Sequence, residues 1–324
     1  MHRSHYECFP NPDGTRGWIW NPITGSLGDC PNPNARKLAN TRLKERYLAN
    51  ENLAGGYRLA RGVYKEGAIP PKYDPFYPRF WDDKLQQPVV KYKSTKAGYI
   101  WKPHKAKGVF CCDMSDLFGI GIPEEWTRQV LNVIDYCCQD RFYLLTKQPQ
   151  NLAKFSPFPE NCFVGQTLTN QDDADRTFND FAKVEATVKY VSLEPLLGRV
   201  DISPYLKGWV NAGTIFENPE GVERYDVDWA LVNHIDWVII GACTGPRKDM
   251  EALIEQHPGL TLMPYGKKWT AQPKIEWVQE IVEACDKAGV KVFLKNNLEE
   301  LLYKADAEWA FDADGALRQE KPSG

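Results

Sequence analysis

The sequence has no hydrophobic run long enough to cross a lipid bilayer. Apolar stretches such as DWVIIGAC, at residues 236–243, are far shorter than the roughly 20 residues that a transmembrane helix needs. The first residues, MHRSHYECFPNPDG, have no apolar core of the kind found in a secretory signal peptide. These absences predict a protein without a membrane segment, located in the cytoplasm.

The sequence also has no cysteine pattern typical of a disulfide framework. Nine cysteines are an odd number, and two pairs are adjacent: Cys111 with Cys112, and Cys137 with Cys138. Because no secretory signal precedes them, we expect reduced thiols. No repeat of fixed period and no low-complexity tract occurs, which argues against a repeat architecture.

What the sequence does have is an alternation of short apolar runs with helical segments. Its 324 residues, 43% of them hydrophobic, suffice for one large domain or a domain with an insert. Continuous apolar runs are typical of strands that are covered on both faces in a parallel sheet. The seven runs lie at residues 17–25, 108–116, 141–149, 162–170, 188–196, 236–245 and 290–297. The alternation predicts an α/β fold with right-handed βαβ units, best described as a TIM-type β/α barrel, partial or complete, of about seven parallel strands.

The same pattern suggests how the chain is divided. We expect an N-terminal tail at residues 1–16, a barrel at 17–300 and a C-terminal extension at 301–324. A helix-like segment at 35–50 follows the first strand, and a long insert at about 50–107 separates the first βα unit from the second.

Positive charge is concentrated in and around this insert. Residues 36–107 contain 17 Lys and Arg against 6 Asp and Glu, and 11 aromatic residues, whereas the rest of the chain is acidic. Basic side chains neutralise phosphates and aromatic rings stack on bases, so the segment predicts nucleic acid as a partner, with Trp81 and Trp101 as substrate-binding residues. The alternative is a solvated, proline-rich excursion whose aromatic residues pack locally, and composition alone leaves both open.

Polar residues follow most of the predicted strands. In a β/α barrel the active site lies at the carboxyl ends of the strands. Each polar residue alone is consistent with turn chemistry, but together they favour a pocket. They are Asp113, Ser115, Asp116, Thr146, Lys147, Thr167, Asn170, Ser192, Glu194, Cys243, Thr244, Lys295 and Asn296. We expect Lys147 and Lys295 to bind phosphate or carboxylate groups of a substrate; two solvated lysines are the alternative.

Six sequence blocks point to a known family. WNPITG, MSDLF, LTKQP, VGQTLTNQDDADR, VSLEPLLG and DWVIIGACTGPR occur in this order. From about Trp20 to Lys295 the chain resembles a phage- and prophage-associated, radical-SAM-like family of unknown function. The resemblance implies S-adenosylmethionine and a four-iron four-sulfur cluster as cofactors, and a large substrate, either nucleic acid or protein. The resemblance implies Cys30 as a cofactor-binding position. From their places at the strand ends we expect Asp113, Ser115, Thr167, Ser192 and Glu194 to bind the cofactor as well. Glu194 could bind its amino group or a ribose hydroxyl; the alternative is an acidic residue at a helix start.

The cysteine loop of this family is degraded here. In the family, a C-x3-C-x2-C loop supplies three thiolates to three irons, and the fourth iron binds the cofactor. The three positions fall on Ser26, Cys30 and Pro33, so that only Cys30 retains a thiolate. Cys111 and Cys112, near the end of the second predicted strand, are the nearest cysteines that could supply a replacement ligand. At most one of them faces the site, because successive strand residues point to opposite faces. The sequence therefore predicts that cluster binding is lost.

Two further interpretations remain. His2, His5 and Cys8, together with Cys30, have the side-chain types that zinc accepts, although terminal residues without an apolar anchor are usually disordered. The GACTGPR loop also departs from the family, which has an acidic residue at the position of Cys243. These departures keep open a second function, a non-catalytic module on the same barrel that binds nucleic acid or another partner.

Overall fold

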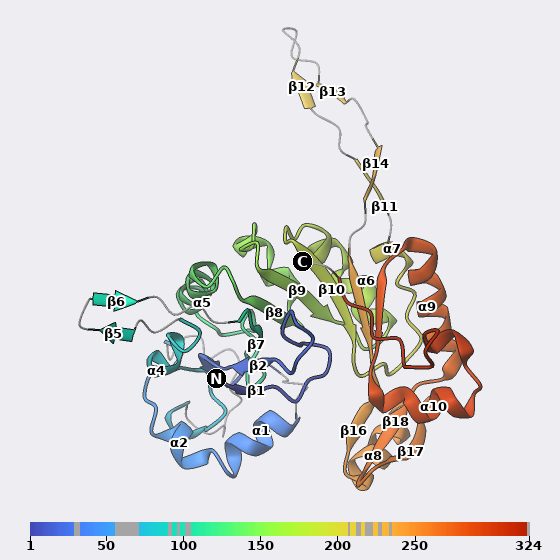
Figure 1. The fold of residues 1–324 in the computed structure, drawn as a ribbon, viewed down its shortest axis with the longest axis horizontal. Helices are drawn as coiled ribbons and strands as arrows, with labels where there is room; N and C mark the ends of the chain where they lie inside the picture. The colour runs from blue at the N-terminus through green and yellow to red at the C-terminus, as the bar shows by residue number, and fades with distance from the viewer. Residues whose placement is uncertain are drawn as a thin grey trace. The chain divides into compact units, whose positions relative to one another are not determined.

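The computed structural model describes residues 1–28, 33–55, 71–89, 93–95, 98–100, 105–206, 208–211, 215–217, 223–225, 229–232 and 235–322. The chain has a mixed α/β fold that divides into two compact units (Figure 1). Unit 1 comprises Met1–Thr167 and Lys183–Val188. Unit 2 comprises Leu168–Ala182 and Lys189–Ser323.

The sheet of unit 1 has the strand order β1-β2-β7-β8-β9. These strands are β1 (His2–Arg3), β2 (Trp18–Trp20), β7 (Gly108–Cys111), β8 (Arg141–Thr146) and β9 (Cys162–Thr167). β1 is antiparallel to β2, and every following pair is parallel. Nearly every residue of β2, β7, β8 and β9 is buried, as expected for parallel strands that are covered on both faces.

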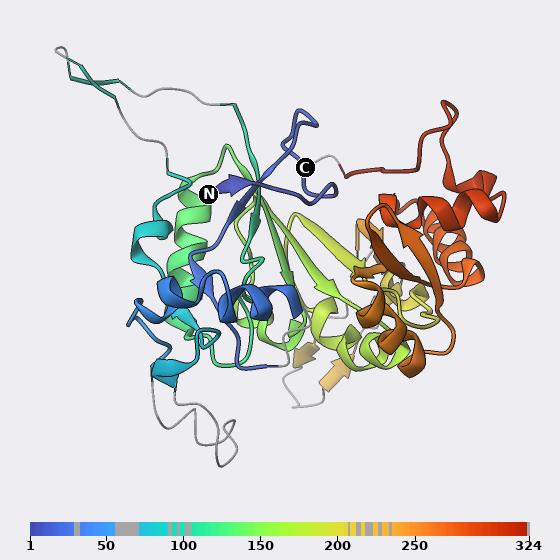
Figure 2. The ribbon, with the colours of Figure 1, turned by 90° about the horizontal axis from the view of Figure 1, so that it is seen from below.

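Helix α5 (Glu124–Tyr136) connects β7 to β8 and lies along these strands (Figure 2). Glu124 and Glu125 occupy its first turn, where negative charge interacts favourably with the helix dipole. Trp126, Val130 and Ile134 are spaced by four residues, and all three are buried. One apolar stripe therefore holds the helix on the unit.

Small elements occupy the long connection between β2 and β7. They are β3 (Ile23–Thr24), α1 (Pro33–Asn40), α2 (Lys44–Leu48), η1 (Pro71–Tyr73), β4 (Arg79–Phe80), α4 (Asp82–Leu85), β5 (Lys93–Thr95) and β6 (Gly98–Ile100). A local core holds several of them together: Ala35, Ala39, Tyr47, Phe76, Trp81 and Met114. The helix predicted over 35–50 is thus two short helices, and this correction follows from a turn at residues 41–43. Farther along unit 1 lie the 3-10 helices η2 (Pro149–Asn151) and η3 (Ala153–Phe155).

The main strands of unit 2 are parallel and have the order β10-β15-β19. They are β10 (Val188–Leu193), β15 (Trp237–Ile240) and β19 (Lys291–Leu294). Helix α9 (Ile275–Ala288) precedes β19 and ends at Gly289, whose φ of 71° is in the left-handed region that glycine adopts readily. A three-stranded antiparallel sheet lies between β15 and α9 in the sequence; its strands, in spatial order, are β16 (Cys243–Gly245), β18 (Lys268–Gln272) and β17 (Thr261–Tyr265).

The remaining elements of unit 2 are short. They are α6 (Gln171–Ala182), α7 (Ser203–Leu206), β11 (Gly208–Asn211), β12 (Ile215–Glu217), β13 (Glu223–Tyr225), β14 (Trp229–Val232), β16 (Cys243–Gly245), α8 (Arg247–Gln256), β17 (Thr261–Tyr265), β18 (Lys268–Gln272), η4 (Asn296–Leu298), α10 (Glu299–Lys304) and η5 (Glu308–Ala310). β11 pairs with β14 and β12 with β13, both antiparallel.

The seven strands predicted from the apolar runs are confirmed as β2, β7, β8, β9, β10, β15 and β19. The parallel α/β class is confirmed within each unit, whereas closure into a barrel stays a prediction. Among the described ranges, no helix is long and apolar enough to span a bilayer.

The first residues of the chain pack onto unit 1 and do not form a free tail. Cys8 and Phe9 are buried, and the hydroxyl of Tyr143 donates a hydrogen bond of 3.0 Å to the carbonyl of Pro10. The backbone amide of Gly108 donates to Asn11 Oδ1 at 2.9 Å. Packing of Phe9 against Phe110 supplies the apolar anchor that we did not identify in the sequence.

Candidate functional site

Asn21 and Asp113 meet at the carboxyl ends of β2 and β7 in unit 1. Asn21 Nδ2 donates a hydrogen bond of 2.6 Å to Asp113 Oδ1, and Asn21 Oδ1 accepts one of 3.3 Å from the amide of Met114. Burial raises the pKa of Asp113, and the hydrogen bond from Asn21 opposes that shift. The preceding residue, Cys112, has a φ of 64°, a strained value for a residue with a side chain that the surrounding structure must hold in place.

Other titratable groups around Asp113 are also shifted. Burial raises the pKa of Tyr47 to about 12, and the charge of Asp113 contributes to that shift. Burial lowers the pKa of Lys84 to about 8, with a further contribution from Arg46 that Asp113 partly offsets. Perturbed titratable groups that cluster at strand ends are typical of functional sites, which makes the surroundings of Asp113 a candidate site.

Two other predicted residues of this edge have structural roles. The Ser115 hydroxyl donates 2.8 Å to the carbonyl of Gly25 and ties the end of β7 to the loop after β3. Asp116 accepts hydrogen bonds from the Thr146 hydroxyl at 2.9 Å and from the Lys147 amide at 3.0 Å. Burial raises the pKa of Asp116, and these hydrogen bonds oppose the shift. Thr167 is half-buried at the end of β9.

Unit 2 brings Glu194 and Lys295 together. The two side chains form a hydrogen-bonded ion pair between the residues that follow β10 and β19, and Glu194 remains 28% exposed and Lys295 12% exposed. Gly241, which follows β15, lies beneath the pair. A Cβ atom there would be 3.0 Å from Lys295 Cδ and 3.2 Å from Glu194 Cγ, so any other residue would crowd both side chains.

Asn297 and Gln272 extend the polar cluster of unit 2. The Asn297 side chain accepts from the amide of Ala242 at 3.1 Å, and donates to the Ala242 carbonyl at 2.8 Å and to Thr244 Oγ1 at 3.1 Å. Gln272 Nε2 donates 2.6 Å to the carbonyl of Asn297. Gln272 Oε1 is buried, with no hydrogen-bond partner in the part of the chain that the structure describes.

Sequence reasoning missed both amides of this cluster. Asn297 had a usable signal, because it comes directly after Lys295 and Asn296, which were both predicted at a strand end. Gln272 had none, since it lies on an antiparallel strand that the alternation of apolar runs does not reveal.

The remaining predicted site residues are dispersed. Ser192 is buried within β10, and Cys30 and Trp101 lie outside the described residues. Trp81 is only 8% exposed, and its indole N–H donates 2.8 Å to Thr24 Oγ1, so as placed the ring is not available for a base to stack on. This corrects the stacking role expected for Trp81. Cys8 is buried, and the described ranges hold no group of three His, Cys, Asp or Glu arranged to bind a metal.

A family model described as "Protein of unknown function (DUF5131)" matches residues 18–252, which is most of the chain. The chain belongs to this family. The match spans the blocks from WNPITG to DWVIIGACTGPR, and the unknown function of the family agrees with the resemblance noted in the sequence. No curated protein shows significant sequence similarity to the chain.

Among solved structures, the chain is similar to spore photoproduct lyase. The complex of that lyase with dinucleoside spore photoproduct gives a TM-score of 0.37 at 10% identity, covering 75% of this chain and 73% of the lyase. A mutant with bound AdoMet and dinucleoside spore photoproduct gives 0.39 at 10% identity, covering 87% and 76%.

Proposed function

We propose that this member of the family is a radical-SAM-like protein that binds S-adenosylmethionine in unit 2 but has lost the four-iron four-sulfur cluster. The observation that carries the proposal is the ion pair of Glu194 and Lys295 over Gly241. We further propose a partial β/α barrel as its architecture, a cytoplasmic location, and a large substrate, nucleic acid or protein, for the relatives that keep their cysteines.

The residues present do not fit the cluster. Two of the three positions that the resemblance implies hold Ser26, whose hydroxyl is a poor iron ligand, and Pro33, whose side chain has no donor atom. The amide of Ser26 donates a hydrogen bond of 3.0 Å to the carbonyl of Phe76, so the first of these positions is held by backbone contacts within unit 1. We therefore assign no redox step to this chain.

The unit 2 cluster does fit the amino-acid end of S-adenosylmethionine. That end has an ammonium group and a carboxylate, and Glu194 and Lys295 offer one charge of each sign at a partly exposed position. Gly241 allows the two side chains to pack closely on its backbone, and the buried Gln272 Oε1 has no hydrogen-bond partner among the described residues. The bound cofactor would supply an electrophilic sulfonium, while Glu194 and Lys295 hold and orient its zwitterionic end.

Replacing Glu194 with Gln, or Lys295 with Met, is expected to weaken S-adenosylmethionine binding by about tenfold or more, because each change removes one charge-assisted hydrogen bond. Binding of 5′-methylthioadenosine, which lacks the amino-acid end, is expected to stay unchanged. Isothermal titration with both ligands measures the difference and also shows that each variant is folded.

Two surface substitutions in unit 2 serve as matched controls. Glu280→Gln breaks the exposed ion pair with Arg199, and Lys304→Met breaks the exposed pair with Glu300, with the same charge changes. Equal losses of affinity in test and control variants, or equal losses for both ligands, contradict the proposal.

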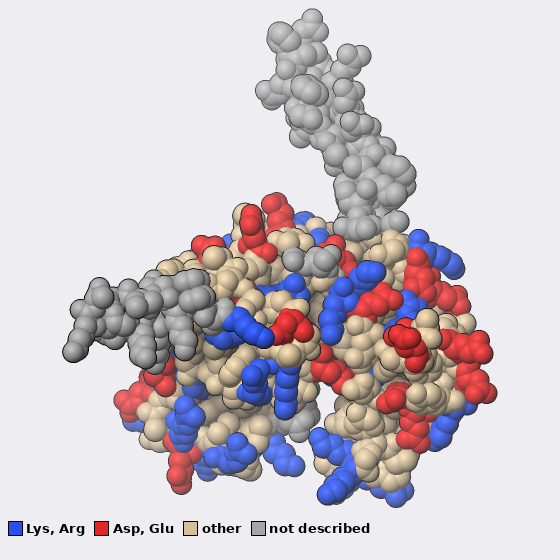
Figure 3. Space-filling view, in the orientation of Figure 1, with Lys and Arg blue, Asp and Glu red and all other residues tan. Residues whose placement is uncertain are grey.

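A second candidate function is nucleic-acid binding by a non-catalytic module. It is supported by the basic composition of residues 36–107 and by the exposed cations of α1 and α2, whose part of unit 1 carries Lys and Arg side chains in Figure 3. Single-stranded oligonucleotide binding that weakens steeply with salt is the expected behaviour.

A further inference from the structure

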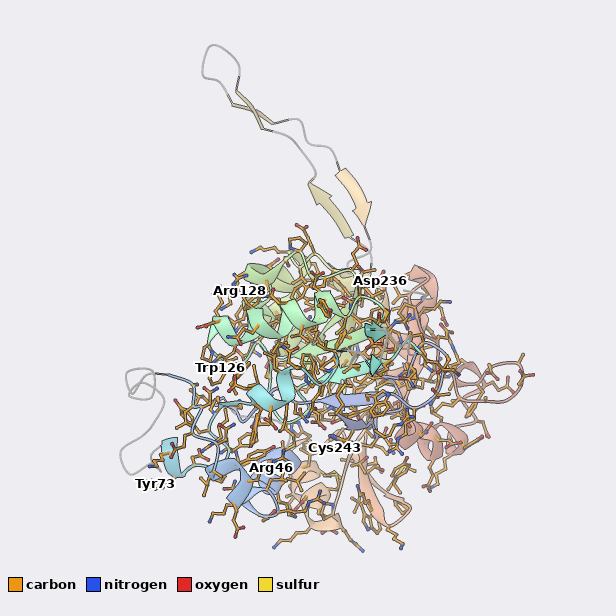
Figure 4. All side chains as sticks on the ribbon, turned by 60° about the vertical axis from the view of Figure 1, so that its left-hand side comes forward. Arg46, Tyr73, Trp126, Arg128, Asp236 and Cys243 are labelled. Carbon is orange, nitrogen blue, oxygen red and sulfur yellow. The ribbon has the colours of Figure 1, made fainter. Side chains whose placement is uncertain are left out.

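Two cationic side chains lie close to the ring of Trp81 in unit 1. Lys84 Nζ lies 3.9 Å from the ring centroid and Arg46 Cζ lies 5.3 Å from it. The ring is fixed by its hydrogen bond to Thr24 and by contact with Tyr47, whose ring centroid is 5.6 Å away. Figure 4 shows Arg46 on the blue helical part of unit 1, and its side chain is exposed.

Neither of these two cations forms an ion pair with a carboxylate of the described residues. No carboxylate among the described residues lies within ion-pair distance of Arg46 or Lys84. Lys84 is half-buried, and burial together with the charge of Arg46 lowers its pKa to about 8. Keeping Lys84 protonated therefore costs free energy, which an anion bound beside its ammonium group would offset.

The arrangement occurs a second time in the same local core. Arg36 of α1 is exposed, and its guanidinium lies 4.7 Å from the centroid of the buried Phe76 ring. Phe76 and Trp81 belong to one cluster of packed side chains, so both rings are rigid supports. In each case an aromatic ring backs a cation whose polar groups remain available to a ligand.

We propose that Arg46 and Lys84, supported by Trp81, form a binding site for a phosphate group, and that Arg36 on Phe76 provides the next contact along a nucleic-acid backbone. The choice of ligand rests on the second candidate function, because a nucleic-acid backbone offers repeated phosphates to separate cations and the surrounding segment is strongly basic. Trp81 is then a positioning residue for the cations and does not stack on a base.

The test is the binding of a labelled single-stranded oligodeoxynucleotide, measured by fluorescence anisotropy over a range of salt concentrations. Arg46→Gln and Lys84→Gln are each expected to lower affinity about tenfold, and to reduce the log–log salt slope by about 0.7 for each phosphate that is no longer neutralised. Arg42→Gln and Lys44→Gln are matched controls, since both are exposed and neighbour Arg46 in sequence, but neither has a described ring contact. We expect less than about a twofold change for these.

A pH series adds a readout that a structural role would not alter. Wild-type affinity is expected to fall above about pH 8, where free Lys84 loses its proton, and this fall is expected to be absent in Lys84→Gln. The comparison isolates Lys84 because the variant keeps the charged and titratable groups that face it: Arg46, Asp83, Cys112, Asp113 and the amino group of Met1.

Competition experiments distinguish a nucleic-acid backbone from a small phosphorylated ligand at this site. Displacement of the oligonucleotide by micromolar AMP or inorganic phosphate would assign the site to a small phosphorylated ligand, and resistance to millimolar amounts would assign it to a nucleic-acid backbone. The site itself is rejected if Arg46→Gln and Lys84→Gln bind as the control variants do. Unchanged S-adenosylmethionine titrations of these variants keep this result separate from the function proposed for unit 2.

Discussion

Replacing Ser26 and Pro33 with cysteine together is expected to convert a chain that assembles no four-iron cluster into one that does. Three thiolates are needed to hold three irons, and the double variant restores the C-x3-C-x2-C spacing around Cys30. Pro33 is the first residue of α1, a position where other residues are tolerated, so the change is not expected to unfold the helix. After anaerobic reconstitution, about four irons and four sulfides per chain are expected, with the broad visible absorbance of the cluster.

The controls for this experiment are the wild type, each single variant, and the double variant carrying Cys30→Ser. All of them lack at least one thiolate and are expected to bind iron only substoichiometrically. A wild-type chain that takes up iron and sulfide near stoichiometry would show that other ligands complete the site. A folded double variant that fails to do so would show that the three thiolates alone are not sufficient to hold the cluster in this chain.

Replacing Arg79 with Leu is expected to lower the free energy of unfolding of unit 1 by about 3 kcal/mol or more. Arg79 has no solvent exposure, and its guanidinium donates to three carbonyls: to Asn50 at 3.1 Å, and to Asp74 and Tyr77 at 2.8 Å each. Leucine would leave these buried acceptors without their donor. The substitution would also weaken the pairing of β4 with β3.

Urea unfolding monitored by far-UV circular dichroism and tryptophan fluorescence measures this effect. Arg42→Leu removes the same charge from an exposed position in the basic segment and is expected to change stability by no more than about 0.5 kcal/mol. Similar unfolding midpoints for the two variants would mean that the buried hydrogen bonds of Arg79 do not stabilise unit 1 as proposed.

The main strands were predictable because each carries its signal within a few neighbouring residues. WVII of β15 and KVFL of β19 are continuous apolar runs, and a strand buried on both faces requires such a run. Helix α9 was predictable for the same local reason, since its apolar stripe ends at a glycine in the left-handed conformation. The curvature of a sheet depends on its twist and on the packing of its two faces, which no short run encodes.

The candidate sites were less predictable because they depend on pairings between distant residues. Glu194 and Lys295 were both selected from strand ends, but 101 residues separate them in sequence and nothing local indicates that they neutralise each other. The charge count of residues 36–107 also treated Arg79 and Arg46 alike, as two cations of the basic segment. Arg79 is buried and hydrogen-bonded to backbone carbonyls, whereas Arg46 is exposed on a helix.

The pairing of β2 with β7 has a consequence for synthesis of the chain. Asn11, whose side chain caps the amide of Gly108, precedes it by 97 residues, and β2 lies beside β7 in parallel. A growing chain leaves the ribosome from its amino end, so β1 and β2 emerge long before β7, the parallel partner of β2. Until then one edge of β2 has no partner, and unpaired strand edges promote association between chains. The time that the basic segment takes to be translated therefore sets how long β2 of a nascent molecule waits for this partner.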